Sequence, residues 1–223
     1  MGQLLKSTLL VLTALFPIVN PLGGAPIFLS LTRYYSAEQR KLLSWRIAIN
    51  SIILIVASYF IGTYILDFFG ISIPVVQVGG GMVVVSTGWA LLKQKEDDVT
   101  KADVHRSVDT NDLFQRAFYP LTLPLTVGPG SISVAITLGA NEPHSTDRLL
   151  MTIIGAVIGS LLIGASVYLC YAFSDRLALA LGATGMSVVM RLSSFLLVCI
   201  GTQIMWNGLS AMLKSLQVVH HAS

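Results

Sequence analysis

The chain has 223 residues, of which 54% are hydrophobic and only 11% are charged, and its mean hydropathy is +0.75. A soluble domain usually carries about 25% charged residues, so this composition excludes an ordinary soluble domain and indicates an integral membrane protein. The net charge of +3 comes from scattered residues without a basic helix or aromatic platform, which excludes a nucleic-acid partner.

Six charge-free apolar runs follow one another, and each has the roughly 20 residues that a helix needs to cross a bilayer. We therefore predict an all-α membrane protein with six transmembrane segments in the lipid bilayer. The N-terminal run resembles a signal peptide, but its apolar character continues to Thr32, so it is expected to be the first span. The runs are 7–32, 47–66, 68–92, 117–140, 149–174 and 192–213.

The Lys and Arg residues are distributed unequally between the two sides that these spans define. All of them except Lys6, Arg148 and Lys214 fall on one side. The positive-inside rule places that side in the cytoplasm, so both termini are predicted to face outward. The longest polar stretch, 93–116, mixes both signs of charge on the cytoplasmic side and is predicted to be a solvated linker.

Two proline-rich stretches interrupt the first and fourth runs. They are FPIVNPLGGAPIF at 16–28 and YPLTLPLTVGPGSI at 119–132, and a shift of 103 residues superposes three prolines. The shift pairs Pro17 with Pro120, Pro21 with Pro124 and Pro26 with Pro129. Proline is scarce in this chain, so the coincidence indicates an internal repeat.

A weaker match at a shift of 113 aligns the segment from Val75 with the segment from Val188. Each half then holds three spans, and an odd number makes the halves enter the membrane from opposite sides, as in many secondary transporters. We predict two inverted three-helix repeats with broken first and fourth helices. The first repeat covers 1–92, the cytoplasmic linker 93–116 and the second repeat 117–223.

Prolines remove backbone donors, and such breaks persist in hydrocarbon only where protein or a water-filled cavity covers them. Half-helices starting after NPLGG and TVGPG would present free N–H groups, and those ending before them would present free carbonyls. These groups could bind an anion and a cation close together, although proline kinks that serve helix packing are the alternative. The predicted substrate-binding residues are Asn20, Pro21, Gly23, Gly24, Thr126, Gly128, Pro129, Gly130 and Ser131.

Several of these polar residues have a second interpretation. Asn20 and Thr126 could instead satisfy backbone groups freed by the prolines, and Ser131 could cap a helix rather than bind a carboxylate. Arg191 is expected to extend to the cytoplasmic interface, or alternatively to serve as a counter-ion for a substrate carboxylate.

The glycines at 79–81, with Gly155 and Gly159, predict close helix packing.

No Asp, Glu or His lies inside the six runs, and Asp67 sits at the edge of the second. This argues against proton coupling through a buried carboxylate and leaves sodium held by carbonyls, exchange and facilitated diffusion open. Nothing indicates an enzyme, a cofactor or a metal site, and Cys170 and Cys199 are expected to pack in the core. A lipid-carrier translocase or membrane interaction protein without a small solute is the alternative function.

The two motifs resemble those of the MarC family of bacterial inner-membrane proteins, over about residues 8–213. The matching positions are Asn20, Pro21, Gly23 and Pro26, then Pro124, Gly128, Pro129 and Gly130, with FGISIP at 69–74. The resemblance implies six spans, an inverted repeat, kinship to LysE-type exporters and a place in the bacterial inner membrane. In that membrane the outward-facing termini predicted from the charge distribution would be periplasmic. It also implies a secondary transporter or exporter of a small neutral amino acid such as alanine or glycine. From the residues alone, Na⁺ and H⁺ both stay open as coupling ions.

Overall fold

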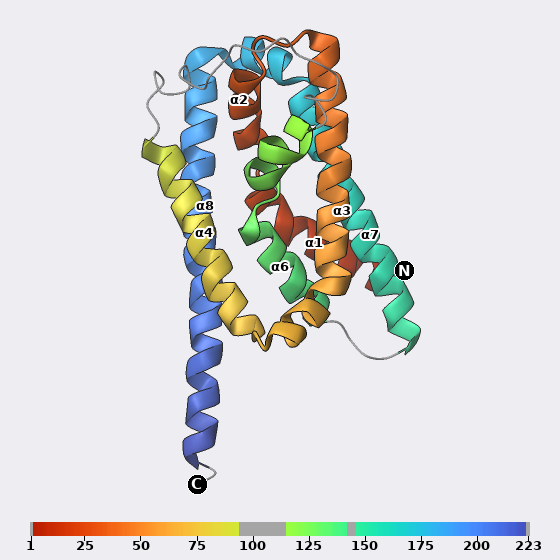
Figure 1. Ribbon diagram of the computed structural model, residues 1–223, viewed down its shortest axis with the longest axis vertical. Coiled ribbons are helices and arrows are strands. Elements are labelled where there is room, and N and C mark those ends of the chain that lie inside the picture. The colour runs from red at the N-terminus through yellow and green to blue at the C-terminus, as the bar shows by residue number, and fades with distance from the viewer. Residues whose placement is uncertain (1, 94–114, 142–145, 222–223) are drawn as a thin grey trace.

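The computed structural model describes residues 2–93, 115–141 and 146–221, and every regular element within these ranges is helical. The all-helical prediction is therefore confirmed. In chain order the elements are α1 (Gly2–Val19), α2 (Pro21–Leu31), α3 (Ala37–Phe69), α4 (Ile73–Lys93), the π-helix η2 (Ala117–Thr126), α6 (Pro129–Ala140), α7 (Thr146–Ala172) and α8 (Ser174–His221) (Figure 1).

Five stretches of the described chain are long and apolar enough to cross a bilayer, and α1 with α2 counts as one of them. The pair η2 and α6, bent by 69°, forms a sixth if it is counted as one span. The five stretches are Gly2–Leu31, Ala37–Phe69, Ile73–Lys93, Leu149–Ala172 and Thr184–Ser215.

Three predicted spans have clearly different limits in the structure. The second begins at Ala37 rather than at residue 47, because Ser36 caps the start of α3. The third begins at Ile73 rather than at residue 68, because Gly70 ends α3 in the left-handed conformation (φ 66°) that glycine adopts without steric cost. The sixth starts at Thr184, just after α8 turns at Gly182 (φ 65°), so the run 192–213 is only its middle part. The predicted linker 93–116 lies outside the described residues except at its two ends.

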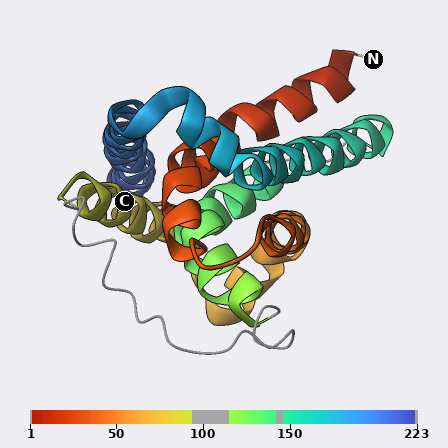
Figure 2. The ribbon, with the colours of Figure 1, turned by 90° about the horizontal axis from the view of Figure 1, so that it is seen from above.

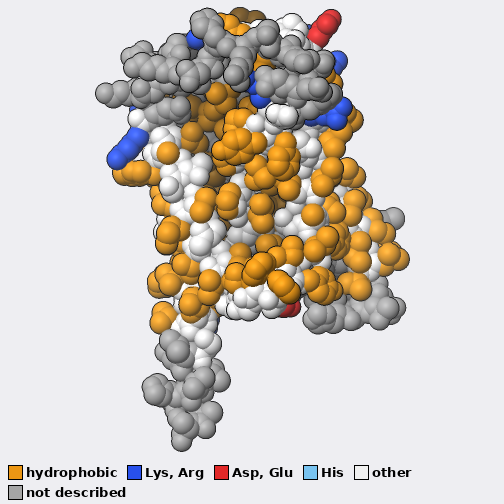
Figure 3. Space-filling model, viewed as in Figure 1, with side chains coloured by type: hydrophobic (Ala, Val, Ile, Leu, Met, Phe, Trp, Pro, Cys, Tyr) orange, Lys and Arg blue, Asp and Glu red, His pale blue; other side chains and the backbone are white. Residues whose placement is uncertain are grey.

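Lys and Arg side chains gather at one end of the molecule, at the top of Figure 3, while hydrophobic side chains cover the middle of this face. We call this the cationic end, and it includes Arg33, Arg40, Lys93 and Arg116 at the ends of helices. Both chain termini lie away from it (Figure 1). The apolar middle and the charged end are typical of a membrane-embedded helical bundle.

Glycines bring the helices together in two places. A Cβ atom on Gly81 of α4 would lie 2.6 Å from the carbonyl oxygen of Gly201 in α8. A Cβ on Gly155 of α7 would lie 2.7 Å from Cβ of Ser7 in α1, and one on Gly159 would lie 2.8 Å from Cβ of Val11. These contacts confirm the predicted close packing for Gly81, Gly155 and Gly159, whereas a Cβ on Gly79 would meet nothing within 4 Å. Figure 2 shows the α4–α8 and α1–α7 pairs side by side.

The short helices α2 and α6 occupy the middle of the bundle. α2 contacts α7, α8 and η2, while α6 contacts α3, α4 and α1. The buried core cluster includes Val19, Ala25 and Phe28 from the first half and Val127 and Ala135 from the second. The two proline-rich segments are thus surrounded by the long helices.

Candidate functional site

The break between α1 and α2 is a single residue, Asn20, in the left-handed conformation (φ 48°, ψ 59°). Asparagine tolerates this conformation better than most residues. α2 then begins at Pro21, and proline suits this position because the first N–H of a helix has no acceptor within the helix. The prediction that this half-helix starts after NPLGG is therefore wrong, because Gly23 and Gly24 lie inside the first turn of α2.

Asn20 itself caps the new helix. The backbone N–H of Gly23 donates to Oδ1 of Asn20 (3.1 Å), and the N–H of Gly24 donates to the Asn20 carbonyl oxygen (2.9 Å). The donors expected to be free at this helix start are thus partly used, which corrects the prediction for α2. This structural use of the Asn20 side chain is the alternative that the sequence left open.

The end of α1 has free acceptors. Pro21 has no N–H, and the N–H of Gly23 is directed to the Asn20 side chain. Within the described residues, no hydrogen bond reaches the carbonyl oxygens of Ile18 and Val19. These two carbonyls therefore remain available to a ligand.

The second break has a different local structure. Pro120 and Pro124 lie inside η2, and the peptide bonds before both are cis. The hydroxyl of Thr122 donates to the Ala117 carbonyl (2.6 Å), and that of Thr126 donates to the Leu121 carbonyl (2.7 Å). These two hydroxyls satisfy acceptors in a segment that lacks two backbone donors, so Thr126 also has the structural role considered for it.

α6 begins without a side-chain cap. Gly128 is the capping residue, Pro129 is the first helical residue, and the N–H of Ile132 donates to the Gly128 carbonyl (3.1 Å). The N–H groups of Gly130 and Ser131 have no acceptor among the described residues. The positive end of the α6 dipole therefore presents two free donors, as predicted, but the predicted start after TVGPG is wrong, because Pro129 and Gly130 lie in the first turn of α6.

A cavity of about 320 Å³ lies between these two breaks, and we call it the site cavity. Its volume is at the small end of the roughly 300–1,000 Å³ range of ligand pockets. It is lined by Ile18, Val19, Asn20, Gly23, Gly24, Ile27, Leu31, Val83, Val84, Thr87, Leu91, Pro120, Pro124, Leu125, Thr126, Gly128, Pro129, Gly130, Ser131 and Leu197.

Eight of the nine predicted site residues line this cavity, and Pro21 is the exception. Pro124 also differs from expectation, since it lies within η2 rather than at the end of a half-helix. α4 and α8 contribute lining residues that the sequence did not indicate, among them Val84, Thr87 and Leu197. The role of all these residues in binding stays a prediction.

None of the described residues lining the site cavity is ionisable. Ser131 is only 2% exposed, and its hydroxyl has no partner in the described part of the chain. The unpaired polar groups of the cavity therefore include donors at the start of α6 and acceptors at the end of α1. A ligand that matches them carries both a negative and a positive group but no net charge.

The glycines around the cavity are required by packing. A Cβ on Gly24 would lie 2.4 Å from the Tyr171 hydroxyl oxygen, and one on Gly130 would lie 2.0 Å from Cγ2 of Val84. A Cβ on Gly128 would meet only the Pro124 carbonyl, at 3.1 Å. Of these three glycines, Gly128 therefore leaves the most room for a larger side chain.

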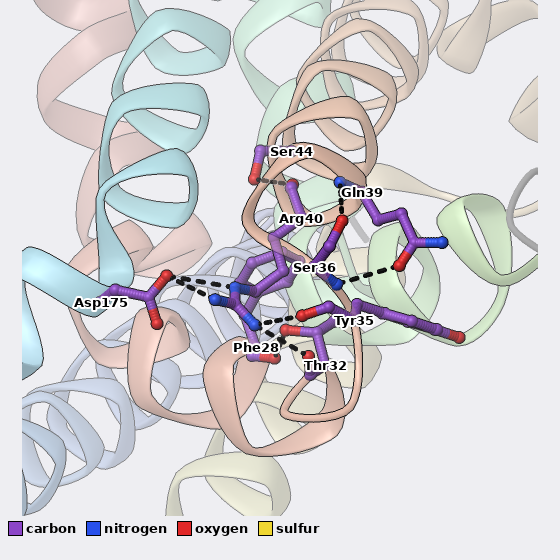
Figure 4. Close-up of polar contacts among 8 residues, drawn as sticks. All are labelled: Phe28, Thr32, Tyr35, Ser36, Gln39, Arg40, Ser44 and Asp175. Atoms are coloured by element: carbon purple, nitrogen blue, oxygen red, sulfur yellow. Dashed lines mark hydrogen bonds and ion pairs between the residues drawn. The ribbon is translucent and has the colours of Figure 1, made fainter.

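A polar cluster at the cationic end fixes the chain that follows α2 (Figure 4). Arg40 of α3 donates to the carbonyl oxygens of Tyr35 (2.6 Å) and Thr32 (3.3 Å) and forms an ion pair with Asp175 of α8 (2.7 Å). The cluster joins α2 and α3 to the start of α8. Sequence patterns did not reveal it, because the partners are far apart along the chain.

Three other polar residues considered for binding or coupling, Asn50, Arg191 and Asp67, do not line the site cavity. Asn50 of α3 donates its side-chain amide to Oγ1 of Thr122 (3.4 Å), so it supports η2. Arg191 lies inside the span of α8, is exposed, and does not line the site cavity, which gives no support to a counter-ion role. Asp67 lies in the last turn of α3, at the end opposite the cationic end.

The MarC family of integral membrane proteins matches residues 5–213. The chain belongs to this family. A UPF0056 membrane protein of Archaeoglobus fulgidus is 30% identical over 92% of this chain and 93% of its own length. The UPF0056 inner membrane protein MarC of Salmonella typhimurium is 29% identical over 96% of this chain and 99% of its own length, and that of Escherichia coli O1:K1 / APEC has the same values. No solved structure matches this chain.

Membership in the MarC family agrees with the apolar helices of the described chain. The names of the Salmonella and E. coli relatives, together with these helices, support a multi-pass protein of the bacterial inner membrane. The family match covers both proline-rich segments and therefore the whole site cavity.

Proposed function

We propose that this MarC family protein is a secondary transporter or exporter of small neutral amino acids of the alanine and glycine type. One observation carries the proposal. Free N–H groups at the start of α6 and free carbonyls at the end of α1 belong to residues that line the same uncharged cavity. Broken helices bind amino acids and ions in this way in many secondary transporters.

The groups of a zwitterionic amino acid match these positions. The substrate carboxylate accepts hydrogen bonds from the N–H groups of Gly130 and Ser131, and the Ser131 hydroxyl is a third donor. The substrate ammonium donates to the carbonyls of Ile18 and Val19. Lysine or glutamate would bring an additional charge into a cavity whose described lining has no ionisable partner, and an unpaired buried charge costs several kcal/mol.

The size of the cavity favours a small substrate. Its volume is about 320 Å³, and apolar side chains such as Ile27, Leu31 and Leu197 form part of the wall. The short side chains of alanine, glycine and serine leave room for the water that a partly polar cavity holds. We therefore expect these three amino acids to bind in preference to leucine or phenylalanine.

The helix contacts support an inverted repeat. In such a repeat α1 corresponds to η2, α2 to α6, α3 to α7, and α4 to α8. The contact between α1 and α7 then has its counterpart in the contact between η2 and α3, and the α2–α8 contact has its counterpart in α6–α4. The contacts α2–α7 and α6–α3 exchange in the same way, while α3–α7 and α4–α8 map onto themselves. We propose that the two halves are related by a pseudo-twofold axis through the middle of the bundle.

The register of this repeat differs from the proline alignment. α2 begins at Pro21 and α6 begins at Pro129, a shift of 108 residues rather than 103. The shift of 103 instead pairs Pro26, inside α2, with Pro129. The segments before the two helices differ correspondingly, since the π-helix η2 precedes α6 and a single left-handed residue, Asn20, precedes α2.

Orientation and coupling complete the proposal. The positive-inside rule places the cationic end in the cytoplasm and both termini in the periplasm. Because the described lining of the site cavity has no acid, the coupling ion we favour is sodium held by helix-end carbonyls, with proton coupling or exchange as alternatives.

The alternative, a lipid-carrier translocase or membrane interaction protein, has less support. A phosphate headgroup favours Arg or Lys, and neither is among the described residues that line the site cavity. Counterflow of labelled alanine into proteoliposomes loaded with unlabelled alanine distinguishes the two functions. We expect uptake with alanine or glycine loading and none with lysine or glutamate loading. Movement of labelled lipid without alanine counterflow would contradict the amino acid proposal.

A further inference from the structure

A second cavity, of about 290 Å³, lies between α1, α4, α6 and α8, and we call it the far cavity. Along α4 and α8 it is displaced from the site cavity away from the cationic end. It is lined by Thr13, Ala14, Pro17, Ile18, Gln77, Val134, Thr137, Leu138, Ile200, Ile204 and Asn207.

The far cavity collects polar side chains from four helices. The hydroxyls of Thr13 and Thr137 donate to carbonyls of their own helices, and Oδ1 of Asn207 accepts from Gln203 (2.9 Å). The side-chain amide of Gln77 has no hydrogen-bond partner among the described residues, and the Asn207 amide group keeps its donors. Polar side chains inside membrane spans face the bundle interior or a water-filled space.

The cavity has the size and chemistry to hold water. A water molecule occupies roughly 30 Å³ in the liquid and needs two to four polar partners. The far cavity has room for several such molecules and offers two side-chain amides together with two hydroxyls. An acyl chain would leave these amides unpaired, which costs free energy.

The two cavities meet end to end along the same helices. On α6 the lining passes from Ser131 to Val134, and on α8 from Leu197 to Ile200. Three residues of helix span about 4.5 Å at 1.5 Å per residue, so less than one turn separates the two linings on α6 and α8. On α4 the nearest lining residues, Gln77 and Val83, are six positions apart, roughly 9 Å. Ile18, the residue next to the end of α1, lines both.

We propose that the far cavity is the water-filled vestibule on the side opposite the cationic end, and that the Ile18 side chain is the partition between it and the site cavity. This inference rests on the proposed transport function. A small zwitterion leaves the free carbonyls at the end of α1 and enters the far cavity when Ile18 moves aside. No other bulky side chain lines both cavities within the described residues.

Cysteine labelling tests the vestibule. Cys170 and Cys199 are replaced by Ala, and single Cys substitutions are introduced at Ala14 (far cavity), Thr87 (site cavity) or Ile53, which is 59% exposed on α3 and lines neither cavity. Right-side-out and inside-out membrane vesicles are treated with a charged, membrane-impermeant methanethiosulfonate. We expect the Ala14→Cys variant to react in right-side-out vesicles, the Thr87→Cys variant in inside-out vesicles, and the Ile53→Cys variant in neither.

Substitution of Ile18 tests the partition. In the Ile18→Ala, Ala14→Cys double variant, the cysteine should become reactive in both vesicle orientations, and preloaded alanine should leak faster from proteoliposomes. Ile18→Leu, which keeps the bulk, is the matched control and should retain the one-sided reactivity.

The outcomes separate this inference from the proposed function. An Ala14→Cys variant as unreactive as the Ile53→Cys variant overturns the vestibule even if alanine counterflow is normal. Unchanged one-sided labelling in the Ile18→Ala background overturns the partition. One-sided labelling in a protein that does not carry alanine supports the vestibule and contradicts the proposed substrate.

Discussion

The hydroxyl of Tyr171, buried in α7, lies 3.0 Å from Oγ1 of Thr126 at the end of η2. Because the Thr126 hydroxyl donates its proton to the Leu121 carbonyl, Tyr171 is the donor of this bond. The Tyr171 ring also stacks on Phe28 of α2, with centroids 4.7 Å apart. One side chain thus connects both proline-broken segments behind the site cavity.

Tyr171→Phe removes this donor and keeps the ring. We expect the variant to fold and to lose about 0.5–1.5 kcal/mol of stability, which is the net contribution of a typical hydrogen bond. Its melting temperature in detergent should fall modestly. Tyr171→Ala, which also removes the stacking on Phe28, should be clearly less stable than Tyr171→Phe. A Tyr171→Phe variant that melts at the wild-type temperature would contradict this role of the hydroxyl.

Gly24→Ala should be destabilising, because its Cβ would lie 2.4 Å from the Tyr171 hydroxyl oxygen. Without that oxygen the nearest ring atom is Cζ at 3.2 Å, a tight contact that small shifts can accommodate. The double variant Gly24→Ala, Tyr171→Phe should therefore be more stable than Gly24→Ala alone. Additive losses in a double-mutant cycle would show that the two residues do not interact.

Substitutions at Gly128 and Gly130 should have different effects. Gly128→Val places its methyl groups near the cavity, where the closest atom is the Pro124 carbonyl oxygen, so we expect loss of alanine counterflow with normal membrane insertion. Gly130→Val meets Cγ2 of Val84 at 2.0 Å and should lower stability as well as transport.

The control for Gly130 is a compensating change on α4. Gly130→Ala with Val84→Ala should regain stability relative to Gly130→Ala alone. Normal counterflow by Gly128→Val would show that the substrate does not occupy the space beside this glycine.

Arg40→Gln should lower stability more than Asp175→Asn. Arg40 donates to two backbone carbonyls in addition to Asp175, and its side chain is only 14% exposed, so we expect a loss of roughly 1–3 kcal/mol. Asp175 is 46% exposed, and such ion pairs contribute about 0–1 kcal/mol. Thermal denaturation in detergent at low and high salt measures both. A larger effect of Asp175→Asn would contradict this assignment.

The membrane orientation is testable with reporter fusions. If the cationic end is cytoplasmic, a C-terminal alkaline phosphatase fusion should be active and a C-terminal fusion to standard green fluorescent protein should be dark. A fusion of each reporter after residue 100, in the predicted linker, provides the opposite control. An inactive phosphatase with a fluorescent C-terminal fusion would reverse the topology.

The sequence by itself determined the membrane class, the apolar runs and the two proline-rich segments in which the helix breaks lie, but not the residues at which α2 and α6 begin. A run of about 20 apolar residues and a proline without an N–H are properties of a short stretch of chain. Spans and helix breaks can therefore be predicted from them before the tertiary structure is known. For the same reason eight of the nine predicted site residues line one cavity, since they cluster at the two breaks.

Only the tertiary structure decided which groups at those breaks are free and which are already bonded. Asn20 turns its side chain back onto Gly23, and α2 starts at Pro21, because one residue in a left-handed conformation is enough to redirect the chain. Tyr171 and Val84 reach the breaks from α7 and α4, and such contacts depend on how glycine-lined helices pack rather than on local sequence.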